Sequence, residues 1–254
     1  MTTLLWLTVP YVAFTSFALG HLWRYRHDQF GWTTRSSQLY ESRLLRLGSP
    51  LFHFGLLAVL FGHVMGLLVP ASWTAWLGIS EHAYHLLSVS MGTVSGMATV
   101  AGLVILLYRR VTVVAVRQVT TGVDKLMYLL LAAAIGTGMG NTVGVNLIGG
   151  GYDYRETVSP WFRGLFVFSS RPELMVGAPL VYQTHALTVL ALLGLWPYTR
   201  LVHVFSAPLG YLTRPYVVYR SKDSHPAASR YAKAWVTPPP AKPSPMVRMG
   251  RGPR

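Results

Sequence analysis

The 254-residue sequence contains no cysteine. It therefore cannot form a disulfide, hold an iron–sulfur cluster or a zinc ion through thiolates, or attach a haem covalently through a CxxCH motif. A metal bound by this chain must take its ligands from histidine, carboxylate, methionine or backbone groups. Only eight residues are aspartate or glutamate, whereas nine are histidine, so histidine is the leading candidate ligand.

Charged residues are also scarce. They make up 12% of the chain, about half the usual share of a soluble domain, whereas 52% of the residues are apolar. Five segments stay apolar over roughly 20 residues, the length that a helix needs to cross a hydrocarbon core about 30 Å thick. They cover residues 4–22, 50–69, 86–108, 126–145 and 176–204. The sequence therefore predicts an all-α membrane protein, a bundle of five transmembrane helices.

Acidic residues are outnumbered by Lys and Arg, 8 to 22. The basic residues lie between apolar runs and not on an amphipathic surface, so we expect no nucleic-acid partner. They alternate along the chain: five arginines follow the first apolar segment, none follows the second, and four basic residues follow the third. By the positive-inside rule, this predicts a multi-pass protein of the cell inner (cytoplasmic) membrane, with the N-terminus outside and the C-terminus in the cytoplasm.

Two regions differ in composition. Residues 1–219 hold the apolar segments and form the predicted transmembrane domain. Residues 220–254 are basic, rich in proline and poor in periodic apolar residues. We expect them to form an extended cytoplasmic tail that orders, if at all, against a partner.

Four histidines fall inside the predicted membrane helices, where a buried imidazole is costly and marks a functional site by default. The second helix carries His53 and His63 in the stretch LFHFGLLAVLFGHVMGLLVP, and the fifth carries His185 and His203. Because these two helices run in opposite directions, we expect His53 and His203 toward the cytoplasm. By the same argument, we expect His63 and His185 toward the outside.

Two antiparallel helices with two histidines each can supply two bis-imidazole sites, the arrangement that a pair of b-type haems requires. The pattern assigns His53 and His203 to an inner haem iron and His63 and His185 to an outer one. In straight helices the spacings disagree, at about 15 Å on the second helix and about 27 Å on the fifth. We expect tilt or a kink at Pro197 to absorb the difference. The alternative is that these histidines form hydrogen bonds between helices or line a polar cavity.

Other residues suit a haem protein without requiring one. Glycines leave room for a flat macrocycle, but they also let helices pack closely. Those in the third and fourth predicted helices are Gly92, Gly96, Gly102, Gly136, Gly138, Gly140 and Gly144. On the cytoplasmic side, Arg109, Arg110 and Arg200 are candidate partners for haem propionates, although arginines at helix ends also set topology.

A titratable cluster stands at the outer end of the third predicted helix. His82 and His85 lie beside Glu81 in GISEHAYHLL. Near an outer haem, such a cluster can accept protons from a quinol as its electrons leave. We therefore take His63, His82 and His85 as candidate quinol-site residues, with an exposed polar turn as the alternative for His82 and His85.

Four stretches carry a family resemblance. They are WRYRHDQFGWTTRSSQL, LFHFGLLAVLFGHVMGLLVP, RRVTVVAVRQVTTGVDKL and QTHALTVLALLGLWPYTRLVHVFSAPLGYLTR. Together they resemble the gamma subunit of respiratory nitrate reductase, a membrane dihaem cytochrome b, over nearly the whole chain up to about residue 219.

The resemblance implies a function in quinol oxidation near the outer membrane face. Electrons would pass through two b-type haems to an iron–sulfur beta subunit and then to a molybdenum-containing alpha subunit in the cytoplasm, where nitrate becomes nitrite. The implied ligands are His63 and His185 for the outer haem and His53 and His203 for the inner one. The family's better-known members have a lysine near the start of helix three; ISEHAYH has none, and His82 is the expected counterpart.

Two other functions stay open from the residues alone. The cytochrome b subunit of a hydrogenase or a formate dehydrogenase also places histidines on membrane helices, in three-histidine or differently spaced sets. A proton-coupled transporter would use the histidines as a relay. Such a relay usually needs carboxylates within the membrane, and no predicted helix carries one in its middle.

Overall fold

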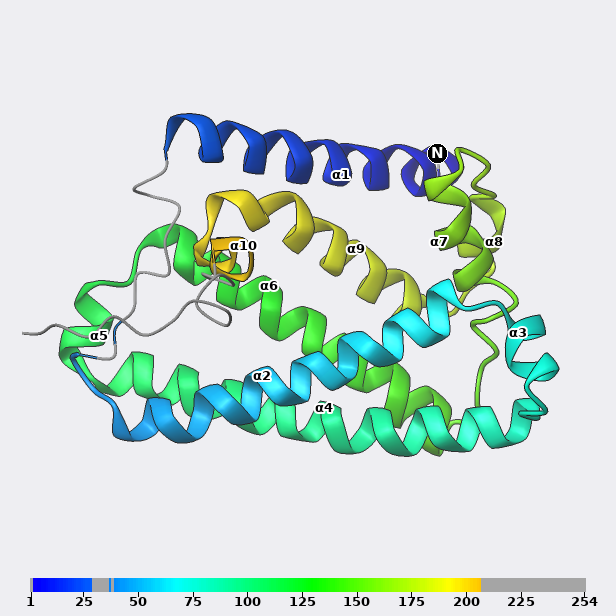
Figure 1. The fold of residues 1–254 in the computed structure, drawn as a ribbon, viewed down its shortest axis with the longest axis horizontal. Coiled ribbons are helices and arrows are strands. Elements are labelled where there is room, and N and C mark those ends of the chain that lie inside the picture. Colours follow the sequence, from blue (N-terminus) through cyan, green and yellow to red (C-terminus); the bar gives the residue numbers. More distant parts are fainter. Residues whose placement is uncertain (1, 29–36, 38, 207–254) are drawn as a thin grey trace, which may run out of the picture. The chain divides into compact units, whose positions relative to one another are not determined.

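The structure, a computed structural model, describes residues 2–28, 37 and 39–206 (Figure 1). Within these residues it is helical and contains no strand. Five of its helices are long and apolar enough to cross a membrane. The predicted all-α, multi-pass membrane fold is therefore confirmed.

The five long helices alternate with short ones. They are α1 (Thr2–His27), α2 (Arg43–His63), α4 (Glu81–Thr112), α6 (Gly122–Met139) and α9 (Leu180–Leu195). Two π-helical segments extend α2 and α6, namely η1 (Val64–Leu68) and η2 (Gly140–Ile148). The short elements are α3 (Ala71–Trp76), α5 (Val114–Gln118), α7 (Val158–Phe166), α8 (Glu173–Val176), η3 (Trp196–Tyr198), η4 (Arg200–Val202) and α10 (His203–Ser206).

Local sequence signals set several helix boundaries. The Ser80 hydroxyl accepts a hydrogen bond from the Ala83 amide and caps α4, so this helix begins at Glu81, earlier than the apolar run indicates. Thr121 and Asp124 form a reciprocal capping box at the start of α6. At the end of η1, Val69 is extended because it precedes a proline, which disfavours helical backbone in the residue before it.

Helices α2 and α4 pack closely along their length because glycines face backbone across the interface. A Cβ at Gly102 would collide with the backbone of Phe52, and a Cβ at Gly55 would lie 2.8 Å from the Thr99 amide nitrogen. Thr99 itself is fully buried. Of the predicted glycine set, Gly96 faces Met139 and Gly92 faces Thr142, so the glycines of α4 serve helix packing.

Two apolar clusters stabilise the bundle. One joins α1, α7, α8 and α9 around side chains that include Trp6, Trp161, Met175 and Leu190. The other joins α2, α4, α6 and α9. Trp6 and Trp161 meet edge to face with ring centroids 5.6 Å apart, and the Trp161 indole N–H donates to the Trp6 carbonyl oxygen. The first cluster therefore fixes α9 against α1, and the second fixes it against α6.

The fifth predicted span, residues 176–204, is wrong at both ends. Helix α9 begins at Leu180 and ends at Leu195, and the chain then makes two 3-10 turns before α10. Pro197 has no amide hydrogen to donate, and Thr199 is extended, so the helix cannot continue. His185 and His203 consequently lie on different helices and do not share a face. This break, and not tilt of one long helix, removes the expected 27 Å spacing.

The predicted tail and the domain boundary at residue 219 lie outside the described residues. They stay predictions, as does the orientation of the termini across the membrane.

Candidate functional site

The first histidine pair joins α2 to α10. The ring centroids of His53 and His203 lie 6.0 Å apart, with the ring planes at 74°. His53 is the central residue of α2, and His203 is the first residue of α10. The structure thus brings together the two residues that the sequence paired by depth.

The second pair joins α2 to α9 at the other end of the bundle. The rings of His63 and His185 also have their centroids 6.0 Å apart, here with the planes at 35°. His63 is the last residue of α2, directly before the π-helical segment η1. A π-helical segment of this kind is rare and often lies at a functional site.

All four imidazoles are held in the same way. Each Nδ1 lies 2.7–3.0 Å from a backbone carbonyl oxygen: His53 with Ser49, His63 with Val59, His185 with Ala134 and His203 with Arg200. A carbonyl can only accept, so each Nδ1 carries the hydrogen. In the neutral ring, Nε2 then keeps a lone pair, which is the form of histidine that binds a metal.

The separation of the rings fits an iron placed between each pair. Two metal–nitrogen bonds of about 2 Å, plus about 1 Å from each nitrogen to its ring centre, give about 6 Å between centroids. Both observed separations are 6.0 Å. Among the residues that the structure describes, no group of three or more His, Asp or Glu side chains gathers as a metal site. Each imidazole pair supplies two nitrogen donors, the number that a haem iron takes from a protein on its two faces.

Glycines on α2 and α6 leave space beside the second pair. A Cβ built at Gly62 or Gly136 meets no atom within 4 Å, whereas one at Gly138 would lie 3.1 Å from Cε1 of His185. Gly62 immediately precedes His63 in the chain. Gly62 and Gly136 thus face open space and Gly138 packs on the His185 ring, and room for a flat macrocycle beside the glycines stays a prediction.

The three arginines proposed as propionate partners already bind protein groups. Arg109 is buried and donates from Nε to the Glu41 carboxylate at 2.6 Å. Its two terminal nitrogens donate to the Ser37 hydroxyl and to the carbonyls of Ser37 and Glu41. Arg110 donates to the Thr120 hydroxyl and lies over the ring of Tyr128. Arg109 thus ties the chain before α2 to the end of α4, and a propionate contact stays a prediction for all three.

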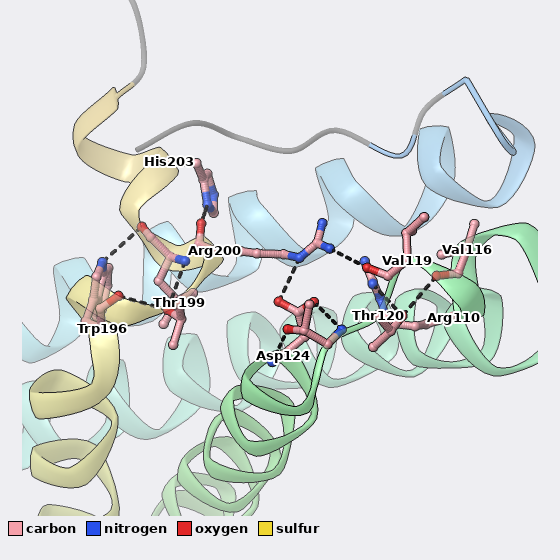
Figure 2. A network of polar contacts seen from close by, with 11 residues as sticks. Arg110, Val116, Val119, Thr120, Asp124, Trp196, Thr199, Arg200 and His203 are labelled. Carbon is pink, nitrogen blue, oxygen red and sulfur yellow. Dashed lines mark hydrogen bonds and ion pairs between the residues drawn. The ribbon is translucent and has the colours of Figure 1, made fainter. Parts of the chain in front are cut away.

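Arg200 belongs to a polar network around the turn between α9 and α10 (Figure 2). Its Nε donates to Oδ1 of Asp124 at 2.7 Å, and its Nη2 donates to the Val119 carbonyl at 2.9 Å. The backbone carbonyl of Arg200 accepts the Nδ1–H of His203. Sequence reasoning missed Asp124, although the TTGVD pattern around it is a capping-box signal.

His82 and His85 stand in the first turn of α4, at the end of the bundle where α2 runs into η1 (Figure 1). The side chain of His82 is exposed and that of His85 is half-buried against Gly151. Glu81 beside them forms an ion pair with Arg155 at 3.3 Å. The structure places the proposed quinol residues at the same end as the second histidine pair, and their role stays a prediction.

A second group that the sequence did not reveal packs around η1. Ser159 donates to the Gly66 carbonyl and Arg163 donates to the Leu67 carbonyl. The Tyr154 hydroxyl lies against Gly66, and burial, with a further contribution from Tyr84, raises the pKa of Tyr154. This phenol therefore stays protonated across the physiological range. No motif marks these residues, because α7 and the loop before it are distant in sequence from η1.

Comparison with known proteins places the chain in a family. Residues 2–222 match the family model described as nitrate reductase gamma subunit. The chain belongs to this family. It is 48% identical to the nitrate reductase gamma chain of Bacillus subtilis over 220 residues, which cover 87% of this chain and 98% of that one.

Other gamma-subunit relatives differ in length. The respiratory nitrate reductase 2 gamma chain of Escherichia coli is 33% identical over 214 residues, 84% of this chain and 94% of that one. The nitrate reductase-like protein NarX of Mycobacterium tuberculosis is 57% identical over 224 residues, 88% of this chain. The matched region spans only 34% of the length of NarX.

Proposed function

We propose that this gamma-family subunit is the quinol-oxidising cytochrome b of a respiratory nitrate reductase in the cell inner membrane. Two b-type haems, held by His53 with His203 and by His63 with His185, would supply the one-electron carriers. The single observation that carries this proposal is the repeated geometry of the two pairs, each with ring centroids 6.0 Å apart.

The chain's own residues would prepare each imidazole for the metal. A carbonyl that accepts the Nδ1–H fixes the tautomer and the orientation of the ring, and it makes the opposite nitrogen a better donor. At His53 and His63 this carbonyl lies four residues earlier on α2, so the helix itself provides the support. At His185 it comes from Ala134 on α6, so this ring depends on packing between helices.

The end of the bundle with His63 would bind quinol on the outer side. His82 and His85 lie there in the first turn of α4, and both can accept protons that quinol releases. The opposite end, with His53 and His203, would face the cytoplasm, where the connections are rich in arginine. Proton release to the outside and electron delivery to the inside would separate charge across the membrane. This stores energy of about 2.3 kcal/mol for each elementary charge moved across 100 mV.

Nitrate chemistry would take place on partner subunits. A chain without cysteine cannot hold the iron–sulfur clusters of a further electron path. We propose an iron–sulfur beta subunit and a molybdenum-containing alpha subunit on the cytoplasmic side. The gamma-chain names of the relatives from B. subtilis and E. coli support a complex of several subunits.

A reduced-minus-oxidised optical spectrum of membranes that contain the full-length chain tests the proposal. We expect b-type haem bands at two haems per chain, and their reduction when a quinol analogue is added. Absence of a haem signal in protein that is inserted and folded would reject the proposal and favour the transporter alternative. A haem signal that quinol does not reduce would reject the quinol-oxidising role alone.

A further inference from the structure

We propose that the ion pair between Asp124 and Arg200 positions His203, and that its two opposite charges together set the reduction potential of the inner haem. Asp124 is a positioning residue in this proposal, since it acts through Arg200 and touches neither the imidazole nor the metal. The inference rests on the proposed function, because it takes His203 as a ligand of the inner haem.

The position of His203 depends on a turn that has little regular structure to hold it. Helix α9 ends at Leu195, and α10 has only four residues, His203–Ser206. By contrast, His53 and His63 each lie on a continuous helix of 21 residues, and their supporting carbonyls belong to that helix. His203 therefore needs tertiary contacts to face His53 at the observed separation.

Asp124 supplies one of these contacts through a buried carboxylate. Its carboxylate is almost fully buried, with 5% of the side chain exposed, and Oδ1 accepts from Nε of Arg200 at 2.7 Å (Figure 2). Oδ2 accepts from the Thr121 amide at 2.9 Å within the capping box of α6. The carboxylate thus joins the rigid first turn of α6 to the turn that carries His203.

Arg200 transmits this constraint to the imidazole. Its side chain is fixed at two points, Asp124 and the Val119 carbonyl, and its own carbonyl accepts the Nδ1–H of His203 at 2.7 Å. The turn is closed further by the Trp196 indole, which donates to the Leu201 carbonyl at 2.9 Å. Movement of the Arg200 backbone would therefore turn the ring of His203 directly.

With His203 as a ligand of the inner haem, the same pair would place two opposite charges on the support of that haem. An oxidised haem iron carries one more positive charge than a reduced one, so a nearby cation favours reduction and a nearby anion favours oxidation. With both members present, the pair is neutral. Removing the carboxylate leaves the guanidinium and should raise the inner potential, whereas removing the guanidinium leaves the carboxylate and should lower it.

Redox titration of the haems in membranes with the assembled complex tests the proposal. The inner haem is identified as the one lost in His203→Ala. We expect Asp124→Asn to shift its potential upward, Arg200→Gln to shift it downward, and the double variant to return it toward the wild-type value. The outer haem should keep its potential in all three. We also expect Asp124→Asn to change the EPR signal of the oxidised inner haem, which reports the relative orientation of the two imidazole planes.

A matched control removes the acidic member of another arginine pair. Glu81→Gln breaks the pair with Arg155 at the opposite end of the bundle and should leave the inner potential unchanged. Asp124→Glu keeps the charge and should keep the inner haem even if Asp124→Asn loses it.

Three results would overturn the inference while the proposed function stands. They are an unchanged inner potential in Asp124→Asn, shifts of the same sign in Asp124→Asn and Arg200→Gln, and equal loss of both haems in Asp124→Asn and Asp124→Glu. Absence of haem from the wild-type chain would instead reject the proposed function.

Discussion

His203 faces His53 across 6.0 Å between ring centroids, although the helix that carries His185 ends at Leu195. The chain makes two short 3-10 turns between these points, and Arg200 within them binds the ring of His203 through its carbonyl. The pair of His63 and His185 is thus built from two long helices, α2 and α9, whereas the pair of His53 and His203 needs the separate four-residue helix α10.

Substitution of either histidine of a pair should remove the same single haem. We expect His53→Ala and His203→Ala to lose one and the same haem, and His63→Ala and His185→Ala to lose the other. The measurement is the haem content of each variant, with the remaining haem identified by its reduction potential. Loss of a common haem from His63→Ala and His203→Ala would disprove the pairing.

His27 provides the matched control for these variants. Its Nδ1 also binds the carbonyl four residues earlier, that of Trp23, but its ring stacks on the Trp23 indole and not on an imidazole. His27→Ala should therefore keep both haems.

Gly102 is required for close packing of α2 and α4. A Cβ at this position would collide with the Phe52 backbone, which cannot yield as a flexible side chain does. We expect Gly102→Ala to destabilise the bundle by about 1–3 kcal/mol, the typical cost of overpacking. Gly122→Ala is the control, because a Cβ there meets nothing within 4 Å and alanine favours helix by roughly 0.5–1 kcal/mol over glycine. In thermal unfolding in detergent, we expect Gly102→Ala to have a lower unfolding temperature than the wild type and Gly122→Ala to have a higher one.

Gly138 is required for the ring position of His185. A Cβ there would lie 3.1 Å from Cε1 of the imidazole, so the ring must move. Changes to residues that hold a metal ligand in place typically reduce metal affinity by about 10–100-fold. We expect Gly138→Ala to weaken binding of the outer haem and to leave the inner one in place. Haem content after extraction measures this effect; equal retention of both haems would contradict it, and Gly144→Ala, at an open position, serves as the control.

Glu41 should make the bundle sensitive to acid. Partial burial raises the pKa of its carboxyl, but hydrogen bonds from the Leu44 amide and from Arg109, together with the charge of Arg109, outweigh this and hold the pKa below its usual value. A carboxyl with a lowered pKa stabilises the folded state above its unfolded pKa, and this contribution is lost as the pH falls through the folded pKa.

We therefore expect the wild type to lose stability below about pH 4.3, the ordinary range for glutamate, and Glu41→Gln to show a flatter acid limb. The measurement is the unfolding temperature as a function of pH. Parallel acid limbs in the two proteins would show that the Arg109–Glu41 pair makes no pH-dependent contribution.

The membrane fold followed from the sequence because crossing a bilayer needs about 20 apolar residues in a row, and such runs are visible in the sequence without a structure. The order of the histidines on two antiparallel segments followed in the same way, and it predicted the two pairs that the structure brings together, although His203 lies on α10 and not on the fifth long helix. The sequence predicted only a kink at Pro197, whereas the structure shows that the helix ends at Leu195. A proline indicates where a helix is weakened but not the path of the chain after it.

The supports of the site were decided only by tertiary structure. Asp124 and Arg200 are 76 residues apart in the sequence, and the packing of the helices brings them together. No periodicity encodes such a contact, because it depends on how α6 and the turn after α9 meet. The sequence by itself thus determined the pattern of long apolar helices and which histidines come together. The packing of the helices decided which distant groups support His185 and the turn before His203, because hydrogen bonds between distant segments form only where the fold brings donor and acceptor within about 3 Å.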